Sequence, residues 1–526
     1  MKRDFPLWIK LFLFRFLLAL STFSTSHPDE LWQFHEPAHA VVFNRGHFTW
    51  DWRARIRSFV FPLPLIAAFW VAKVVGKMGF VDLEDFIVQI APVVIKAFWA
   101  STTDLYTMKL ARKFFGPLST KWALLFSLSS TAQAQVGTRA YSNSVETALC
   151  AVAAYIWPTN RREWSRRKWI SALAVLGLTC LIRISAVQMF LPAALFVFLY
   201  APNPLEVIFT AIPLMAFIVS IGVAIDSYFY GELTVSWWNF FQWNVVQNVS
   251  SFFGVSPFYF YFNTLRSELL KTALPFTLFG LFKALTNFKS VFPFFLFVLP
   301  YFVFSSIQPH KEHRFLLPIL PLLLVYAAHG GQQFELWLHK KHRYFKYSAK
   351  VLLMAMVAYN SWEIVKETSL KFIGPWNAMQ DVRSRVKALK MSSETTKPTA
   401  EGILILATCH YFPNYGVFHY DYPLTFISCP PYFSHRFFKK DKDYDFQSKL
   451  ASYFFSGLVD EALEYFVNHS EKPPAFVLTV GHNYLGKIDH VKSLGYEQCG
   501  RHTNFILDYY EGRDSSMNDV FILCHK

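Results

Sequence analysis

Long apolar runs alternate with short polar gaps over the first two-thirds of this chain. A helix of about 20 apolar residues crosses a bilayer. We therefore expect membrane helices near residues 6–24, 59–76, 86–111, 121–137, 144–158, 169–200, 204–225, 272–286, 290–307, 314–330 and 348–364. Because the run 169–200 is long enough for two helices meeting at Arg183, the pattern predicts an all-α polytopic membrane protein of about 10–12 spans.

The pattern changes after residue 366, where hydropathy falls and a segment rich in Lys, Ser and Thr follows. Beyond it, four short apolar runs are typical of buried strands, at 402–407, 475–480, 504–509 and 520–524, and two helical patterns lie at 456–468 and 484–494. We expect a membrane domain at 1–365 that includes a first loop at 24–58, a linker at 366–400, and a small α/β domain at 401–526.

Composition supports a membrane protein, since 53% of the residues are hydrophobic and 19% are aromatic. The net charge of +15 raises the question of nucleic-acid binding. However, dense basic clusters at 161–168 and 340–346 lie in short gaps between apolar runs, as the positive-inside rule predicts for cytoplasmic loops. We therefore expect no nucleic-acid partner.

Charge also predicts the sidedness of the loops. Lys2 and Arg3 precede the first run, which lacks a clean cleavage site, so this run is expected to be an uncleaved anchor with a cytoplasmic amino terminus. Counting back from 340–346 places 138–146, 226–271, 307–314 and the whole carboxyl-terminal domain in the lumen. The two counts differ by one crossing. Either 59–76 is re-entrant or interfacial, or a long segment is split.

Two glycosylation sequons fall in the regions expected in the lumen, at Asn248 and Asn468. Of the six cysteines, Cys150 and Cys180 lie in apolar runs. The other four share the luminal tail and allow three pairings: Cys409, Cys429, Cys499 and Cys524. One or more disulfides in the tail is therefore an open expectation.

The first loop begins with His27-Pro28-Asp29-Glu30, two adjacent carboxylates beside a membrane span. Three interpretations stay open. The acids complement the dipole of a helix that begins at Pro28, or one of them is a general base. The third is a zinc site at His35-Glu36-x-x-His39, which matches a metallopeptidase pattern. Pro37 argues against the zinc site, because proline inside a helix costs about 3 kcal/mol.

A general base that promotes displacement of a phosphate would need cationic groups for the leaving group. Another loop expected in the lumen supplies His310, Lys311 and Arg314. The alternative is a helix-end cluster that reaches toward lipid head groups. Arg139 and Arg183 are further candidates, and an unpaired Arg183 at mid-span would cost about 3 kcal/mol.

Aromatic residues near the first loop also have two interpretations. Trp50 and Trp52 could stack on sugar faces or belong to the interfacial aromatic belt, and the run 237–244 presents the same choice. A multi-span protein with an arginine inside a span is also compatible with a lipid or ion transporter. The absence of visible repeats and the large tail argue against transport.

Four motifs carry a family resemblance, and they occur in order along the chain: His27-Pro28-Asp29-Glu30; Thr49-Trp50-Asp51-Trp52 with Ile56-Arg57-Ser58; Thr138-Arg139-x-Tyr141-Ser142-Asn143-Ser144-x-Glu146; and His310-Lys311-Glu312-x-Arg314-Phe315. Together they resemble the endoplasmic-reticulum α-mannosyltransferases of glycosyltransferase family 22, which use dolichyl-phosphate-mannose. In the tail, Cys409-His410-x2-Pro413-x-Tyr415, Pro423-Leu424-x-Phe426 and Cys429-Pro430-Pro431 resemble the branch that adds the third mannose of the glycosylphosphatidylinositol (GPI) anchor precursor.

The resemblance implies a GT-C membrane fold and inverting transfer. Because a departing dolichyl phosphate needs no strong protonation and cationic groups could stabilise it, we expect no required metal. Asp29 is the implied base, with Glu30 second and His27 beside them. His310, Lys311, Arg314 and Arg139 would bind the donor phosphate, and Trp50, Trp52 and Arg183 would line the substrate. The implied reaction is α-1,2 transfer to the second mannose of the GPI precursor in the endoplasmic reticulum. Other branches, acting on the lipid-linked N-glycan or adding a fourth GPI mannose, remain alternatives.

Overall fold

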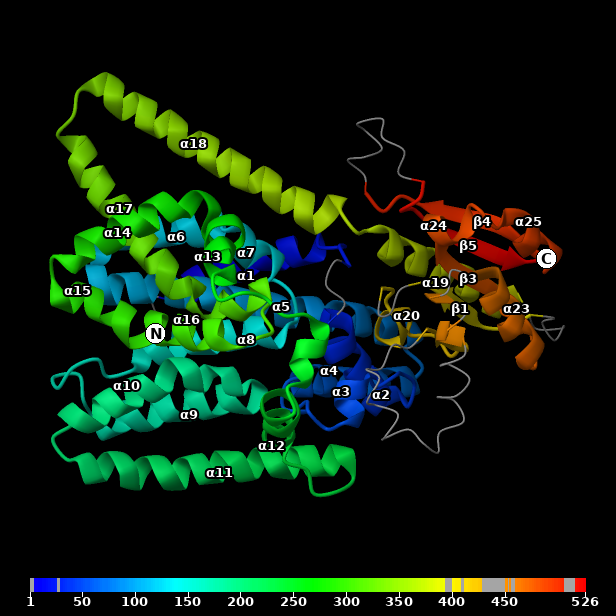
Figure 1. The fold of residues 1–526 in the computed structure, drawn as a ribbon, viewed down its shortest axis with the longest axis horizontal. Helices are drawn as coiled ribbons and strands as arrows, with labels where there is room; N and C mark the ends of the chain where they lie inside the picture. Colours follow the sequence, from blue (N-terminus) through cyan, green and yellow to red (C-terminus); the bar gives the residue numbers. More distant parts are fainter. Residues whose placement is uncertain are drawn as a thin grey trace. The chain divides into compact units, whose positions relative to one another are not determined.

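The computed structural model describes residues 4–25, 29–392, 400–407, 411–427, 450–452, 454–455, 459–505 and 516–526. Most of these residues are helical, and a single sheet lies near the carboxyl end (Figure 1). The chain forms two compact units. Unit 1 consists of residues 1–20, 55–63 and 92–365, and unit 2 of residues 21–54, 64–91 and 366–526.

Unit 1 is all-helical in its described residues. Its main helices are α1 (Phe5–Leu20), the carboxyl part of α5 (Val81–Phe115), α6 (Thr120–Leu128), α7 (Thr131–Gln135), α8 (Ser142–Ile156), α9 (Arg166–Ile182), α10 (Val187–Tyr200), α11 (Pro204–Tyr230), α12 (Ser236–Phe241), α13 (Phe260–Thr264), α14 (Leu274–Leu285), α15 (Phe288–Pro293), α16 (Leu299–Ile307), α17 (Leu320–His339) and α18 (Arg343–Val365). Among the described residues, four helical stretches are long and apolar enough to cross a membrane: 81–115, 204–230, 288–307 and 313–339.

Helix α11 shows how the sequence sets a span. The side chain of Asn203 accepts a hydrogen bond from the backbone N–H of Glu206, and Pro204 occupies the first helical position. The helix ends at Gly231, whose φ of 75° is left-handed and favours glycine. Only 6% of its most apolar window is buried, as expected for a helix that faces lipid. In Figure 1, α9, α10 and α11 lie side by side.

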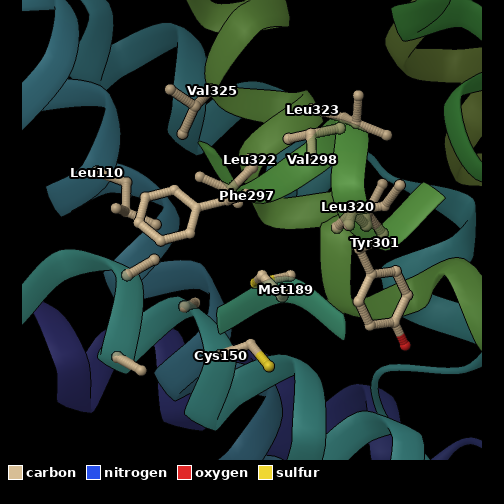
Figure 2. Packing of buried hydrophobic residues seen from close by; sticks show 14 of the residues in the cluster. Leu110, Cys150, Met189, Phe297, Val298, Tyr301, Leu320, Leu322, Leu323 and Val325 are labelled. Atoms are coloured by element: carbon tan, nitrogen blue, oxygen red, sulfur yellow. The ribbon is translucent and has the colours of Figure 1, made fainter. Parts of the chain in front are cut away.

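Close helix packing stabilises the centre of unit 1. Helices α14 and α17 approach so closely that a Cβ on Gly280 would lie 1.9 Å from the carbonyl oxygen of Tyr326, so only glycine fits there. Figure 2 shows the neighbouring core, where Leu110, Cys150, Met189 and Phe297 come from four different helical segments. This core is apolar and holds the helices that carry part of the candidate site.

The helix bounds bear on two expectations about the spans. The run 169–200 is divided at Arg183 into α9 and α10, as its length predicted. The run 59–76 is covered by α4 (Leu63–Lys77), which has 15 residues and groups with unit 2 from residue 64 onward. It is therefore shorter than the four stretches of spanning length, and whether it crosses the membrane stays a prediction.

Unit 2 contains the one sheet of the described residues, with strand order β2-β1-β3-β5-β4. Strand β1 pairs in parallel with β2 and β3, whereas β5 pairs antiparallel with β3 and β4. The strands are β1 (Ile403–Leu406), β2 (Leu424–Phe426), β3 (Phe476–Val480), β4 (Tyr496–His502) and β5 (Val520–His525). Among the described residues, the main helices of this unit are α2 (Glu36–Phe43), α3 (Trp50–Arg53), α4, the amino part of α5, α19 (Gly374–Ser392), α20 (Tyr415–Phe418), α23 (Val459–His469), α24 (Gly481–Tyr484) and α25 (Ile488–Ser493).

The sheet is covered on both faces. Side chains of β1, β3 and β5 alternate between two apolar clusters, one with α19 and one with α23 and α25. The first cluster also takes in Leu31 and Trp32 from the first loop, which are 7% and 3% exposed. The amino-terminal loop and the tail therefore share one hydrophobic core.

The expected mixed α/β character of the tail is confirmed, with differences in detail. Three of the four expected strands coincide with β1, β3 and β5. The fourth, 504–509, has an isolated bridge at Phe505 and otherwise lies mainly outside the described residues. Cys499 and Cys524 form a disulfide, and Cys409 and Cys429 lie outside the described residues. The division into 1–365, 366–400 and 401–526 stays a prediction.

Candidate functional site

The two carboxylates of the first loop lie on the first turn of a helix. Asp29 and Glu30 begin a continuous helical stretch that runs through a π-helical turn, η1 (Leu31–His35), into α2. Asp29 is partly exposed, whereas Glu30 is 4% exposed. Asp29 is therefore the more accessible acid for a substrate hydroxyl. His27 lies outside the described residues.

The π-helical turn explains why Pro37 does not end this helix. Pro37 is the second residue of α2, which begins immediately after η1. A π-turn widens the backbone, so the carbonyl with which the proline ring would clash in a regular α-helix is displaced. Proline was an argument against the zinc site, and the structure shows that the segment is nevertheless helical. Local π-turns occur often at functional sites.

In the pattern His35-Glu36-x-x-His39, the side chains of Glu36 and His39 form hydrogen bonds with other groups of the protein. His39 is fully buried, with Nδ1 2.7 Å from the carbonyl oxygen of Arg45 and Nε2 2.9 Å from Nδ1 of His419. Glu36 is also buried and accepts hydrogen bonds from backbone N–H groups. In the part of the chain that the structure describes, no three His, Cys, Asp or Glu residues are arranged to hold a metal ion.

The tryptophans of the first loop differ in exposure. Trp52 is 1% exposed in α3, and its ring lies 6.2 Å from that of Phe48. A residue of the interfacial belt would face the lipid boundary, which does not fit such burial. Trp50 is only partly buried. Its assignment to the substrate stays a prediction.

In unit 1, a buried carboxylate holds Arg183. Glu146, the fifth residue of α8, is fully buried, and its Oε2 lies 3.0 Å from Nε of Arg183. Ser185 donates to Oε1 of Glu146 at 2.7 Å, and Arg183 donates to Oγ of Ser142 at 3.1 Å. Arg183 joins the end of α9 to the next turn in extended conformation. A buried arginine needs a partner, and Glu146 is the partner of Arg183.

The loop after α16 forms a second ion-pair group in the same unit. Glu312 pairs with Nε of Arg314 at 2.7 Å and with Nε2 of His310 at 3.2 Å. Burial would raise the pKa of Glu312, but the charge of Arg314 and hydrogen bonds from His310 and Arg314 lower it to about 2. The hydrogen bond to Glu312 raises the pKa of His310. Glu312 is therefore ionised at neutral pH and favours protonated His310.

Aromatic rings join the two groups. The guanidinium of Arg183 lies 5.5 Å from the centre of the Phe315 ring, and that of Arg314 lies 6.0 Å from the same centre. Arg314 also lies over Tyr141 at 5.4 Å. We call Arg183, His310 and Arg314 with their carboxylates Glu146 and Glu312 the cationic cluster.

The other predicted phosphate ligands have backbone partners. Lys311 is 7% exposed, and its ammonium donates to the carbonyl oxygen of Ser256 at 2.9 Å. Arg139 donates from Nε to the carbonyl oxygen of Gln135 at 2.8 Å, two residues before Tyr141. These bonds fix both side chains near the ends of helices. Their binding of a phosphate stays a prediction.

The sequence indicated some functional positions without assigning them a role. Glu146 was part of a recognised motif, but its pairing with Arg183 needed the fold. Tyr301 was missed: its hydroxyl lies 3.0 Å from the carbonyl oxygen of Phe315 and 3.5 Å from Oε1 of Glu146. Nothing in the apolar run around Tyr301 distinguishes it from a core residue.

Each unit thus has its own chemical capability. The helix of unit 2 presents a partly exposed carboxylate that could accept a proton. The cationic cluster of unit 1 contains two arginines and a histidine that favours its charged form, which suits an anion such as phosphate. A carboxylate base and a phosphate-binding group are what displacement of a phosphate by a hydroxyl needs.

Comparison with known proteins points to the same chemistry. Residues 7–419 match the Alg9-like mannosyltransferase family. The chain is 29% identical over 420 residues to GPI mannosyltransferase 3 of Yarrowia lipolytica, covering 80% of this chain and 76% of that protein. It is 27% identical over 405 residues to GPI alpha-1,2-mannosyltransferase 3 of Homo sapiens, covering 77% of this chain and 68% of that protein.

The fold also resembles a solved structure. The crystal structure of ArnT from Cupriavidus metallidurans bound to undecaprenyl phosphate aligns with a TM-score of 0.52, covering 98% of this chain and 97% of that one. The sequence identity is 12%, so this likeness concerns the fold alone. It confirms the expected GT-C architecture with a small carboxyl-terminal sheet domain.

Proposed function

Because the chain belongs to the Alg9-like mannosyltransferase family, we propose that it is the α-1,2-mannosyltransferase that adds the third mannose to the GPI-anchor precursor. The observation that carries this proposal is the similarity to relatives named for that step over 77–80% of the chain. The donor would be dolichyl-phosphate-mannose and the acceptor hydroxyl would belong to the second mannose. Membership of a glycosyltransferase family sets the transporter interpretation aside.

Asp29 is our preferred general base. It would take the proton of the acceptor hydroxyl as the oxygen bonds to the anomeric carbon of the donor, and the bond from that carbon to the phosphate oxygen breaks. A single displacement inverts a β-linked donor to an α-linked product. The partial exposure of Asp29 supports this choice over Glu30, which is 4% exposed.

The cationic cluster would stabilise the departing dolichyl phosphate. Arg183, Arg314 and protonated His310 can donate charged hydrogen bonds to oxygens that gain negative charge as the bond breaks. The departing dolichyl phosphate is a monoalkyl phosphate, which is a weak enough base to leave without full protonation. We therefore expect no metal requirement, and chelation with EDTA should leave transfer intact.

We place the protein in the membrane of the endoplasmic reticulum with unit 2 in the lumen. With 59–76 removed from the spans and 169–200 divided at Arg183, the count from the amino terminus agrees with the count from the basic cluster at 340–346. The amino terminus is then cytoplasmic, and residues 138–146, 231–271, 308–312 and the tail are luminal. Both sequon asparagines are exposed in this arrangement.

The deciding experiment is to delete the protein from its cells and identify the lipid-linked glycan that accumulates. We expect a GPI precursor with two mannoses, which the restored wild-type protein extends by one α-1,2-linked mannose. Accumulation of a three-mannose GPI precursor or of a truncated dolichol-linked oligosaccharide would assign the chain to another branch of the family and contradict the proposal.

A further inference from the structure

The helix that carries Asp29 and Glu30 is anchored in the tail by the two residues that follow them. Leu31 and Trp32 belong to the same buried cluster as Ile403, Phe418 and Phe426 of the tail, and the rings of Trp32 and Phe426 lie 4.8 Å apart. Removing the tail would therefore expose the residues adjacent to the candidate base.

A second attachment is made by Glu36, two turns along the same helix. Its two carboxyl oxygens accept from the backbone N–H groups of His47 at 2.9 Å and Gly416 at 2.8 Å. Glu36 is 2% exposed. Because a buried carboxyl group needs partners, these bonds fix the helix against the loop that follows it and against α20.

A third attachment is a directed hydrogen-bond chain through two histidines. The carbonyl oxygen of Arg45 can only accept, so Nδ1 of His39 carries its proton. Nε2 of neutral His39 must then accept from Nδ1 of His419. Nε2 of His419 faces Oε1 of Glu84 at 3.7 Å. The carbonyl oxygen of Arg45 thus determines the tautomers of His39 and His419. These directed hydrogen bonds fix how α2 is aligned with the residue that follows α20.

Gly416 lies at the closest approach of the two elements. A Cβ there would come 2.9 Å from the backbone carbon and Cβ of His35 and 3.0 Å from the backbone nitrogen of Glu36. No real side chain accepts such contacts, so α20 is packed directly on the helix backbone. Only glycine at residue 416 permits this register.

From these three attachments we infer that α20 is a positioning element for transfer, which holds the helix of Asp29 and Glu30 in its reactive orientation. The inference rests on the function proposed above. It assigns the tail a role in the chemical step, rather than in binding the donor. Trp32, Glu36, His39, Gly416 and His419 are positioning residues, because they act through the helix and not on the substrate.

The test compares two glycine substitutions in the full-length protein, reconstituted in lipid nanodiscs with dolichyl-phosphate-mannose and a two-mannose GPI precursor. Gly416→Ala inserts a methyl group at the contact with His35 and Glu36. Gly486→Ala is the matched control, because a Cβ there meets nothing within 4 Å. Alanine favours helix formation over glycine, so a loss in Gly416→Ala reflects the contact and not helix propensity.

We expect Gly416→Ala to lower kcat at least tenfold with KM for the donor within twofold of wild type, while Gly486→Ala matches wild type. Hydrogen exchange of the amides at 29–43 should be at least tenfold faster in Gly416→Ala, with β1, β3 and β5 still protected. Unchanged kcat overturns the inference, whether or not the helix exchanges faster.

Two further outcomes are distinguishable. If β1 and β3 also lose protection, Gly416→Ala has unfolded the sheet. Glu36→Gln then serves as the test, because it keeps the side-chain volume but loses one hydrogen-bond acceptor. A wild-type kcat in Glu36→Gln overturns the inference. A wild-type protein that transfers no mannose to this acceptor contradicts the proposed function instead. In that case the rate at which free mannose is released from the donor is compared between Gly416→Ala and wild type. Equal rates in the two proteins overturn the inference.

Discussion

Arg15 and Asp104 form a fully buried ion pair inside unit 1. Nε of Arg15 lies 2.7 Å from Oδ2 of Asp104, Nη2 lies 2.8 Å from Oδ1, and both side chains are 0% exposed. Ser127 contributes its carbonyl oxygen to Arg15 and its hydroxyl to Asp104. The three residues connect α1, α5 and α6, so a charged group in the first apolar run is compensated inside the protein.

Breaking this pair should destabilise unit 1 strongly. We expect Arg15→Leu to cost about 3–5 kcal/mol, because it leaves the carboxylate of Asp104 buried without its cation. The double variant Arg15→Leu/Asp104→Leu should recover most of the loss, since apolar residues replace both charges. The measurement is the thermal unfolding midpoint in detergent. A single variant as stable as wild type would contradict the compensation.

Asp29→Asn should abolish mannose transfer while leaving the amount of folded protein unchanged. A general base contributes about 100-fold or more to the rate, and asparagine cannot accept the proton. The measurement is product formation per mole of purified protein. Activity above about a tenth of wild type would remove Asp29 from that role, and Glu30→Gln, tested in parallel, would show whether the neighbouring acid takes it.

Arg183 is predicted to have both a structural and a functional role, which a pair of variants separates. Arg183→Ala should lower stability, since Glu146 would remain buried without its cation. Adding Glu146→Gln should restore stability because the buried charge is gone. We expect the stable double variant still to have a KM for the donor raised about tenfold, roughly the loss of one charged hydrogen bond. A normal donor KM would limit Arg183 to a structural role.

Glu36 predicts a pH dependence of stability on the alkaline side. Burial raises the pKa of Glu36 to about 8 from 4.5, against the opposing effect of its hydrogen bonds from Gly416 and His47. The folded state therefore keeps a proton that the unfolded chain loses, and this contribution is complete below pH 4.5 and declines as the pH rises to about 8. Wild type should lose stability between about pH 6.5 and 9, while Glu36→Gln should lose much less.

The histidines near Glu36 affect the pH dependence of stability in the opposite direction, and they provide an internal control. Burial lowers the pKa of His39 to about 3 and that of His47 and His419 to about 4, from 6.5. For His39 the hydrogen bond to the carbonyl oxygen of Arg45 opposes this effect, while the charges of His419 and Arg45 lower the pKa further. The charges of Arg45 and Arg383 lower the pKa of His419. Their contribution declines as the pH falls below 6.5, so the window above pH 6.5 isolates Glu36. An equal decline in wild type and Glu36→Gln over that window would refute the assignment.

The proposed sidedness predicts the modification of two asparagines. Asn248 and Asn468 are exposed in sequons, so both should carry glycans if their segments are luminal. Asn248→Gln and Asn468→Gln should each increase gel mobility by one glycan, and glycosidase treatment of wild type should produce both shifts. Absence of both glycans from wild type would leave the sidedness without this support.

The pattern of apolar residues predicted the elements whose sequences are uniformly apolar and buried. Strands β1, β3 and β5 are such runs, and the bend at Arg183 follows from the length of 169–200. Strand β4 was not predicted because its sequence, YEQCGRH, is polar and largely exposed, although it pairs with β5. Strand β2 was not predicted because it has only three residues. The run 59–76 is apolar like a span, and composition alone does not distinguish burial in protein from contact with lipid.

The candidate site could be predicted where its residues lie close in sequence. The motifs indicated Asp29, Glu30, His310 and Arg314, and the cost of a buried arginine required a partner for Arg183. Glu36 and His39 lie close in sequence, but Glu36 bonds to Gly416 of α20 and His39 to His419 just after α20, each 380 residues away. Long-range hydrogen bonds leave no local pattern, so the same residues suggested a zinc site.

The shared core of the first loop and the tail has a consequence for biosynthesis. Since 380 residues separate Glu36 from Gly416, synthesis at 5–20 residues per second leaves the loop waiting for its partner for roughly 20–80 s. During that time Leu31 and Trp32 lack the surface that buries them. The nascent loop is then a natural client for chaperones, and a chain that stops before the tail would have complete membrane helices but an unfinished amino terminus.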